Sequence, residues 1–516
     1  MKVNMVFKNG KCLSMDENKI YDWVAIDGDK IVAVGMGETY EDLICESTTV
    51  IDAEGNTVMP GFIDSHFHMV QTALNGLSVD LSKARTFDDI ADLIIESGNK
   101  NPEMSIQGIR LDKSKLKEKR LPTRQEIDRF WNNSAVWLNT YDYLVSALNT
   151  YGLLYYKIPF TQIGVQFDEK NMPSGIFKDN ANVLLRANIL NELDDFYRME
   201  ALETLIPKIA EQGLTTVNAM EGGRVYSDKD AEFINNVIRS NKLYVDMELF
   251  FQTLDFDSIQ RMGLKRIGGC MYVDGTFSSH TAAISFDYFD APGEKGILKF
   301  TQDKLDWFVE QCYHRNYQLA LYTLGDRAID MSIKAHKKAA EITGNTSLRH
   351  RLEHVELPTD QHIQSAKELG LIFSMQPSYE YTWGGEGKMY AERLGDKYKL
   401  TNPFRQILDG GVKICGGTDS DTTELNYLLG IHSAVNHPVK CHQVSIMDAI
   451  RMFTCHGAYA INQENIKGYL EKGYLADIVL LDHDILKSPK AQIKDIKVKM
   501  TVKSGKIVYS HNKFMC

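Results

Sequence analysis

Eight apolar, strand-like segments alternate with helical patterns through the middle of this 516-residue chain. The segments that we predict as strands are Val58–His68, Thr215–Met220, Leu243–Phe250, Arg266–Gly275, Tyr317–Gly325, Leu348–Val355, Leu371–Gln376 and Val412–Gly417. The predicted helices between them include Ala201–Gln212, Asp230–Arg239, Lys304–His314 and Arg327–Ile342. This alternation is typical of βαβ units with a parallel sheet. Because eight such repeats close into a barrel, we predict a (β/α)8 TIM barrel.

The two ends of the chain share a different pattern, in which short strands are broken by polar turns. Asp27-Gly28 separates two alternating apolar runs near the N-terminus, and Lys503-Ser504-Gly505 separates two further strands near the C-terminus. We predict that residues 1–57 and 466–516 form one small β-sandwich domain and that residues 58–465 form the barrel. The stretch of about residues 70–199 is too long for a simple crossover. It therefore predicts an insertion after the first barrel strand, which we interpret as a lid over the barrel mouth.

Charge and cysteine content narrow the classes of function. A formal net charge of −11 disfavours binding to nucleic acids or to anionic membranes, which select basic surfaces. The eight cysteines include no C-x-x-C pair, so a disulfide framework is not expected. No apolar run approaches the ~20 residues of a membrane-spanning helix, and the N-terminal segment turns polar before a signal-peptide core could form. We predict a cytoplasmic protein that acts on a small molecule.

The strongest local signal is a pair of histidines at the end of the first predicted barrel strand. His66 and His68 are two residues apart, so their side chains point to the same side of a strand. Two imidazoles at the carboxyl end of a barrel strand can chelate a borderline metal ion such as zinc. The alternative is two partly exposed histidines in a loop, because short motifs also occur by chance.

Four other strand ends carry polar side chains, and each of them alone is a weak signal. The eighth strand leads into Asp419, although a lone Asp after a strand is more often a helix cap. The sixth strand contains His350 and His354; His354 is nearer the strand end, and packing explains His350 equally well. Cys270 lies in the fourth strand and Tyr322 in the fifth. Because a barrel builds its active site from the carboxyl ends of its strands, these residues together predict one site.

The segment Pro60-Gly61-Phe62-Ile63-Asp64-Ser65-His66-Phe67-His68 resembles the opening motif of the amidohydrolase superfamily. Further segments are similar to its amidohydrolase-3 branch, which includes the N-substituted formamide deformylases. They are Leu121–Arg124, Asp274–Gly275, Gly325–Ile329, Arg351–His354, Met375–Pro377, Gly417–Ser420 and Gly473–Asp477. The resemblance runs almost from end to end and implies a barrel with a two-ended β-domain and a metal-dependent hydrolase activity.

Two positions depart from the pattern of the resembled family. Its members usually have a histidine where this chain has Tyr322, and commonly a lysine that can be carboxylated where it has Cys270. A cysteine is a metal ligand in the similar D-aminoacylases, which implies that role for Cys270; the alternative is an inert buried thiol. Because a tyrosine hydroxyl is a poor zinc ligand at neutral pH, we expect one tightly held divalent ion, zinc. The predicted ligands are His66, His68, Cys270, Asp419 and His354, of which His354 either completes the shell or binds substrate.

The expected reaction is hydrolysis of a C–N bond, in an amide or an N-substituted formamide, by metal-activated water. Asp419 is the predicted general base and then general acid, and Tyr322 is predicted to donate a hydrogen bond to the developing oxyanion. Tyr379 and Trp383 lie in an aromatic stretch after the seventh strand and, with His354, are predicted to contact substrate. An ordinary surface loop with buried aromatic side chains explains that stretch equally well.

Two other kinds of function stay open at this point. The same site could deaminate a ring or open a cyclic amide, because both reactions also add water to a carbon that carries nitrogen. Outside enzymes, the departures at Tyr322 and Cys270 could mark a barrel that has lost turnover and acts as a binding or regulatory protein. The resembled family also admits a homodimer, for which the residues themselves offer no sign.

Overall fold

A computed structural model of the protein describes residues 2–141, 143–223, 226–240 and 243–511. The chain forms two compact units. The first comprises Met1–Met69, Ile206–Glu221 and Ile234–Cys516, and the second comprises Val70–Leu205 and Gly222–Phe233. Across the described ranges, we find no helix with the length and apolar character needed to cross a membrane.

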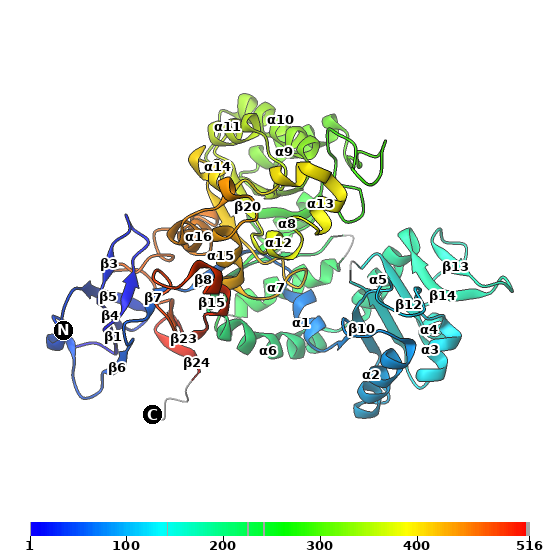
Figure 1. Ribbon diagram of the computed structural model, residues 1–516, viewed down its shortest axis with the longest axis horizontal. Helices are drawn as coiled ribbons and strands as arrows, with labels where there is room; N and C mark the ends of the chain where they lie inside the picture. Colours follow the sequence, from blue (N-terminus) through cyan, green and yellow to red (C-terminus); the bar gives the residue numbers. More distant parts are fainter. Residues whose placement is uncertain (1, 142, 224–225, 241–242, 512–516) are drawn as a thin grey trace. The chain divides into compact units, whose positions relative to one another are not determined.

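The centre of the first unit is a sheet of eight parallel strands (Figure 1). In their order across the sheet the strands are β21 (Ile414–Gly416), β20 (Ile372–Met375), β19 (Arg351–His354), β18 (Gln318–Thr323), β17 (Arg266–Tyr272), β16 (Asp246–Phe251), β15 (Leu214–Glu221) and β8 (Phe62–Phe67). A parallel bridge between Phe67 and Ser420 and a 2.8 Å hydrogen bond from the Asp419 N–H to the His66 carbonyl close the sheet into a barrel. The predicted (β/α)8 barrel is confirmed.

Helices follow most of the barrel strands, and their ends carry ordinary helix signals. They include α6 (Asp195–Glu211), α7 (Asp228–Ser240), α8 (Phe256–Met262), α9 (Gln302–His314), α10 (Asp326–Thr343) and α11 (Asp360–Glu368). Helix α10 begins with the acidic Asp326 in its first turn and ends at Gly344, which has the left-handed φ of 68° that suits a helix C-terminus. Three of the four helical stretches predicted from periodicity fall within α7, α9 and α10, and the fourth, Ala201–Gln212, ends one residue beyond α6.

The first barrel strand is shorter than predicted, because Val58–His68 is not one strand but parts of two. Strand β7 (Thr57–Pro60) belongs to another sheet, where Met59 pairs with Val479 of β22 (Ile478–Leu481), and the barrel strand β8 starts only at Phe62. Gly61 lies between them, and a Cβ there would lie 2.3 Å from Cγ2 of Thr215. A glycine therefore permits the close approach at which the chain passes from one sheet to the other.

The sheets outside the barrel in the first unit are built from both chain ends. One sheet contains β5 (Lys30–Gly35), β4 (Trp23–Asp27), β1 (Met5–Lys8) and β6 (Thr49–Asp52). The other contains β24 (Lys506–Ser510), β23 (Val498–Lys503), β22 (Ile478–Leu481), β7, β2 (Lys11–Leu13) and β3 (Ile20–Tyr21). Phe7 and Val24 share a buried cluster with Ile478 and Val502. This shared core supports the predicted two-ended β-domain.

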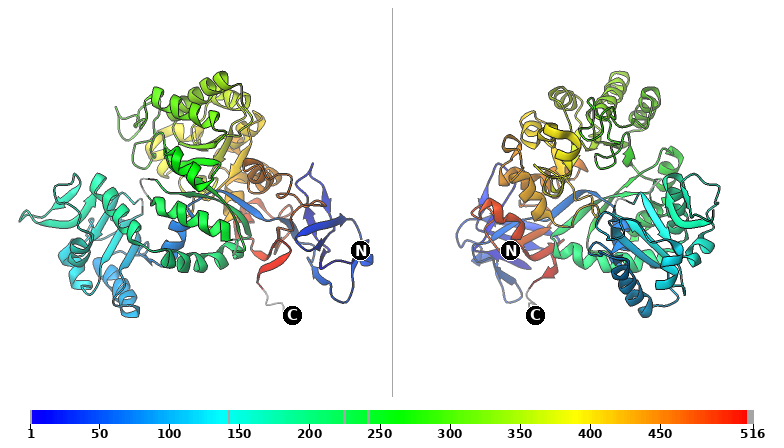
Figure 2. Two further views of the ribbon diagram at one scale, coloured as in Figure 1. Left: turned by 180° about the vertical axis from the view of Figure 1, so that it is seen from behind. Right: turned by 45° about the vertical axis from the view of Figure 1, so that its right-hand side comes forward.

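The second unit has a mixed sheet of its own, seen from two sides in Figure 2. The strands, in order, are β13 (Val165–Phe167), β14 (Pro173–Lys178), β12 (Val145–Leu148), β11 (Val136–Thr140), β10 (Ile106–Leu111) and β9 (Val79–Asp80). Its helices are α2 (Phe87–Lys100), α3 (Arg124–Phe130), α4 (Thr150–Tyr156) and α5 (Asp179–Glu192). The inserted segment is thus a folded body rather than a long loop, and its interpretation as a lid stays a prediction.

Candidate metal centre

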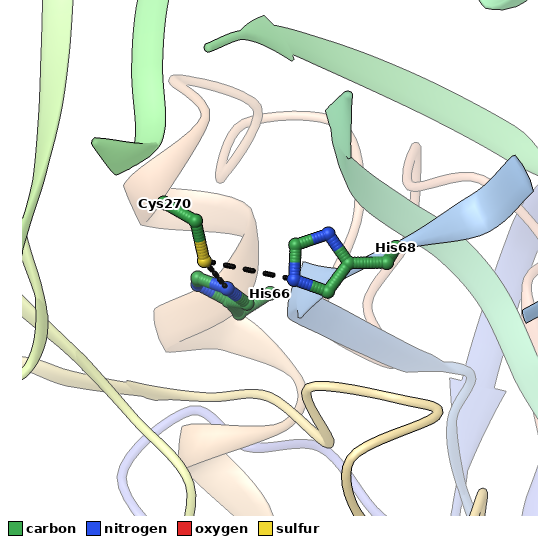
Figure 3. A group of neighbouring side chains, drawn as sticks. All are labelled: His66, His68 and Cys270. Carbon is green, nitrogen blue, oxygen red and sulfur yellow. Dashed lines mark hydrogen bonds between the residues drawn. The ribbon is translucent and has the colours of Figure 1, made fainter. Parts of the chain in front are cut away.

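The two histidines of the opening motif meet a cysteine from the other side of the barrel. The Cys270 sulfur lies 3.1 Å from Nε2 of His66 and 3.6 Å from Nε2 of His68 (Figure 3). All three side chains are buried. Their ligand atoms are grouped within 4.8 Å of one another, close enough to share one metal ion.

Asp419 and His354 complete the group. Oδ1 of Asp419 lies 3.1 Å from Nε2 of His68 and 3.5 Å from Nε2 of His66. Ligand atoms of His354, His66 and Asp419 also lie within 4.8 Å of one another. All five predicted ligands therefore come together at the carboxyl ends of the barrel strands.

Unusual backbone angles aim three of these side chains. His354 and Asp419 have positive φ values of 71° and 50°, a region that non-glycine residues rarely adopt and that is often found at functional sites. Cys270 follows Gly268 and Gly269, whose φ values are 96° and 113°, at a point where the register of β17 shifts. A Cβ on Gly268 would lie 2.0 Å from the Ala320 carbonyl oxygen. Only glycine allows this bulge, which redirects the side chains that follow it.

The far nitrogen of each imidazole has its own partner. Nδ1 of His66 donates to Glu353 Oε2 at 2.7 Å, and Nδ1 of His68 donates to the Met220 carbonyl at 2.9 Å. These bonds select the tautomer in which both Nε2 atoms carry a lone pair toward Cys270 and Asp419. When both imidazoles are neutral, nitrogen, thiolate and carboxylate acceptors converge without a donor between them, and a cation among them would stabilise the arrangement.

The electrostatics of the cluster agree with this reading. Burial disfavours charge on the imidazoles, but the negative charge of Cys270 outweighs it and raises the pKa of His66 to about 10 and the pKa of His68 well above its usual range. Burial likewise opposes ionisation of Cys270, but the two histidines lower the pKa of its thiol far below the ordinary value. The negative charges of Cys270 and Asp419 thus attract positive charge, which protons on the imidazoles or a bound cation can supply. Two imidazoles, a thiolate and a carboxylate fit a divalent ion of intermediate softness.

Sequence reasoning missed the residues that hold these ligands in place. Glu353, fully buried, accepts from Arg351 Nε at 2.8 Å as well as from His66. Burial raises the pKa of Glu353, but the guanidinium of Arg351 outweighs this and lowers it to about 2. Asp64 accepts from the hydroxyls of Thr418 at 2.7 Å and Tyr427 at 3.0 Å. Asp64 and Glu353, which stand in the same sequence segments as His66 and His354, were the signal that could have revealed these supports. Metal-bound histidines usually donate a hydrogen bond to a carboxylate or a carbonyl.

The predicted tyrosines lie beside the cluster, but their hydroxyls are already engaged. Tyr322 is 4.3 Å from His354 between ring centroids, and its hydroxyl donates to the Gly275 carbonyl at 3.1 Å. Tyr379 belongs to a short helix, α12 (Ser378–Thr382), and its hydroxyl donates to Oδ2 of Asp419. Trp383 packs edge-on against Tyr379 with 4.5 Å between centroids. His350 is elsewhere, with its Nδ1 accepting from the Leu319 N–H at 3.0 Å, as its alternative packing role predicts.

The carboxyl ends of β19 and β20 also hold buried polar groups with unused hydrogen-bonding capacity. Several buried atoms there make no hydrogen bond of normal geometry with a described residue. They are both ring nitrogens of His354, both amide atoms of Gln376 and Oε2 of Glu356. Burial and the like charges of Glu380 and Asp274 raise the pKa of Glu356 to about 8. Buried polar atoms without partners are rare in proteins and often mark a place where a ligand or water binds.

The fold and this cluster define a class of protein: a (β/α)8 barrel that gathers metal-ligand side chains at the carboxyl ends of its strands. The chain belongs to the amidohydrolase family, whose model matches residues 49–509. This membership confirms the resemblance found in the sequence.

Individual relatives are similar over nearly their whole length. The chain is 25% identical over 513 residues to the protein LONG AFTER FAR-RED 3 of Arabidopsis thaliana, covering 93% of this chain and 87% of the relative. It is 25% identical over 521 residues to N-substituted formamide deformylase of Arthrobacter pascens, covering 94% of each. Among solved structures, an uncharacterized metal-dependent hydrolase from Pyrococcus horikoshii OT3 superposes with a TM-score of 0.79 at 22% identity, covering 94% of this chain and 99% of that one.

Proposed function

We propose that this protein is a metal-dependent hydrolase that cleaves the C–N bond of a small amide or N-substituted formamide. The convergence of four acceptor atoms, from His66, His68, Cys270 and Asp419, is the observation that carries the proposal. Similarity to a formamide deformylase supports the type of bond. The solved hydrolase from Pyrococcus shares the fold.

One zinc ion fits this set of ligands best. His66, His68, Cys270 and Asp419 would hold it, and His354 would either complete the shell or bind the substrate. A zinc ion in such a site supplies a nucleophilic water near neutral pH and polarises the substrate carbonyl. The carbonyl of Met220 and the carboxylate of Glu353 keep the two imidazoles in the ligating tautomer.

In this proposal Asp419 carries the proton. Its Oδ1 faces the histidines, while its Oδ2 is held by the hydroxyl of Tyr379. In the proposed reaction Oδ1 accepts a proton from the attacking water and returns it to the nitrogen as the C–N bond breaks, so that the products are an acid and an amine. Tyr322 would stabilise the oxyanion only by exchanging its bond to the Gly275 carbonyl for one to the substrate.

Metal content and turnover test this proposal together. We expect about one zinc per chain in the parent, measured by elemental analysis after purification without chelators, and loss of zinc in Cys270→Ala. Asp419→Asn should lower the rate of formamide or amide hydrolysis by at least about 100-fold. Tyr322→Phe should lower turnover and leave zinc content unchanged; loss of zinc instead would make Tyr322 a ligand. A parent protein that takes up no metal even when incubated with zinc would refute the proposal.

The products separate the remaining alternatives. Ammonia from a ring substrate would identify a deaminase, and a ring-opened product without a released amine would identify a cyclic amidase. A protein that binds zinc but hydrolyses none of these compounds would favour the binding or regulatory role. A cytoplasmic location and a homodimer stay predictions.

A further inference from the structure

Glu356 is a buried carboxylate close to the metal centre. It lies two residues beyond His354, after the carboxyl end of β19, and only 2% of it is exposed. Its Oε2 accepts no hydrogen bond from the described residues. The hydroxyl of Tyr390 is close enough to stabilise the ionised form of Glu356 and to oppose the rise in its pKa that burial causes, although the two groups do not meet in normal hydrogen-bond geometry. Among the described residues this carboxyl group has no cationic partner, which a buried charge normally requires.

Other buried carboxylates of the chain have such partners. Glu353 pairs with Arg351, Asp230 with Arg198 and Asp477 with Lys503. Two more are satisfied by neutral donors: Asp274 accepts from the N–H groups of Ala283, Leu324 and Gly325, and Glu380 accepts from Thr401 and Asn402. For Glu356, no ion pair is found among the residues that the structure describes. Oδ1 of Asp419 and Oε2 of Glu118 also lack hydrogen bonds, but Asp419 faces the two histidines and Glu118 is only half-buried, so Glu356 differs from the other buried carboxylates named here in having neither an ion pair nor a set of neutral donors.

Glu356 adjoins a cluster of aromatic side chains, to which the next residue, Leu357, belongs. Four tyrosines lie close enough for its charge to add to the effect of burial in raising the pKa of their hydroxyls: Tyr288, Tyr322, Tyr379 and Tyr390. Three of these hydroxyls donate elsewhere, to Ala282, Gly275 and Asp419, and cannot satisfy the carboxylate. The same tyrosines pack in one cluster with Phe277, Leu357 and, at its edge, Trp383.

An unpaired carboxylate among aromatic rings is suited to bind a cation. Ring faces attract ammonium groups, and the attraction grows when water is excluded. A charge-assisted hydrogen bond from an ammonium group would satisfy Oε2. Gln376, 1% exposed and with both amide atoms unpartnered, provides a donor and an acceptor at the end of the neighbouring strand β20. A carboxylate group on a substrate would instead add negative charge beside Glu356, Asp274 and Glu380, where like charges already oppose ionisation of Glu356.

We propose that the substrate carries a protonated amine, separate from the bond that is cleaved, and that Glu356 and the tyrosine cluster recognise this amine. This inference rests on the proposed hydrolase function and defines its substrate class: cationic amides or formamides, in preference to neutral or anionic ones.

Three formamides of matched length test the inference. The first is cadaverine formylated on one of its two amines, which keeps an ammonium group at the other end. Hexylformamide has a methyl group in place of the ammonium group, and formylaminocaproate has a carboxylate there. In the zinc-loaded parent we expect kcat/KM for the cationic compound to exceed that for the neutral one by at least about tenfold. Glu356→Gln should abolish this preference, so that kcat/KM for the cationic and the neutral compound differ by less than about threefold, while zinc content stays that of the parent.

The control is Asp360→Asn, which makes the same change of charge at an exposed position four residues away. It should keep the preference for the cationic compound. Equal or better hydrolysis of the neutral or anionic compound by the parent, or the same preference in Glu356→Gln as in the parent, would overturn the inference and leave the hydrolase function standing.

A binding measurement separates the inference from the reaction. Aminohexanol and heptanol differ only in an ammonium and a methyl group, and neither can be hydrolysed. We expect calorimetry to show binding of aminohexanol at least about tenfold tighter in the parent, and no such difference in Glu356→Gln. If no formamide is hydrolysed but this result is obtained, the proposed function fails and the recognition of a cation stands. Equal binding of the two alcohols by the parent would overturn the recognition itself.

Discussion

The buried pair of Glu353 and Arg351 supports His66, and the substitution Glu353→Gln measures what this support contributes. Oε2 of Glu353 accepts from His66 Nδ1 at 2.7 Å and from Arg351 Nη2 at 3.0 Å, while Oε1 accepts from Arg351 Nε at 2.8 Å. An amide removes the charge and turns one acceptor into a donor. Leaving Arg351 buried without a counter-charge should lower the free energy of unfolding by about 3–5 kcal/mol. Losing the bond that orients His66 should weaken zinc binding by about 10–100-fold.

Two assays separate these effects. Urea denaturation of the metal-free protein measures the loss of stability, and competition with a chelator measures the dissociation constant of zinc. The control is Asp230→Asn, because Asp230 and Arg198 form a similar buried pair, 2.8 Å apart, in the second unit. It should lower stability comparably and leave zinc affinity unchanged. The reasoning would be refuted if Glu353→Gln bound zinc as tightly as the parent. It would also be refuted if Asp230→Asn weakened zinc binding as much as Glu353→Gln does.

Three other predictions follow from groups outside the ligand cluster or behind it. Burial lowers the pKa of His336 to about 3 from its ordinary 6.5, so the unfolded chain binds more protons between these values and stability should fall as pH drops through this window. Between pH 6.5 and pH 4, the free energy of unfolding measured by urea denaturation should fall more steeply in the parent than in His336→Gln, by up to roughly 1.4 kcal/mol per pH unit. Gly268→Ala should lower the free energy of unfolding by at least about 2 kcal/mol and reduce zinc content, since the new Cβ meets a backbone oxygen. Gly293 has a similar φ but open space around it, so Gly293→Ala should lower the free energy of unfolding by about 1 kcal/mol and leave zinc content unchanged. Hydrogen bonds from Ser47 and Thr48 lower the pKa of Cys45 to about 7, so iodoacetamide at pH 7.5 should modify it well before the buried Cys12, as peptide mass spectrometry can follow.

Much of the barrel could be predicted because its signals are local. Each parallel strand is buried on both faces and reads as a short apolar run, and each helix repeats its apolar residues with a period near 3.6. These patterns can be recognised in the sequence without knowing any contact between residues that are distant in the chain. The patterns do not reveal the strand boundary at Gly61, because the residues before and after it are both apolar. Only the structure shows that β7 and β8 pair in different sheets.

The site was only partly predictable for the same reason. The pair His66 and His68 is visible in the sequence, since two residues at a spacing of two share one side of a strand. Other ligands stand at strand ends, where a barrel brings them together. Glu353 and His354, however, are adjacent and would point to opposite faces of a regular strand; the left-handed backbone at His354 lets both serve the cluster.

Tertiary structure alone decided which groups meet. Cys270 lies 204 residues from His66 in the chain, and Glu353 lies 287 residues from it, yet both contact its imidazole. Such contacts depend on the closure of the barrel, the bulge at Gly268 and the register of neighbouring strands, and none of these is encoded by a local period. Local periodicity thus determined the kind of fold and the most visible candidate metal ligands. The partners of each side chain, and the lack of an ionic partner for Glu356 among the described residues, exist only once distant strands are packed together.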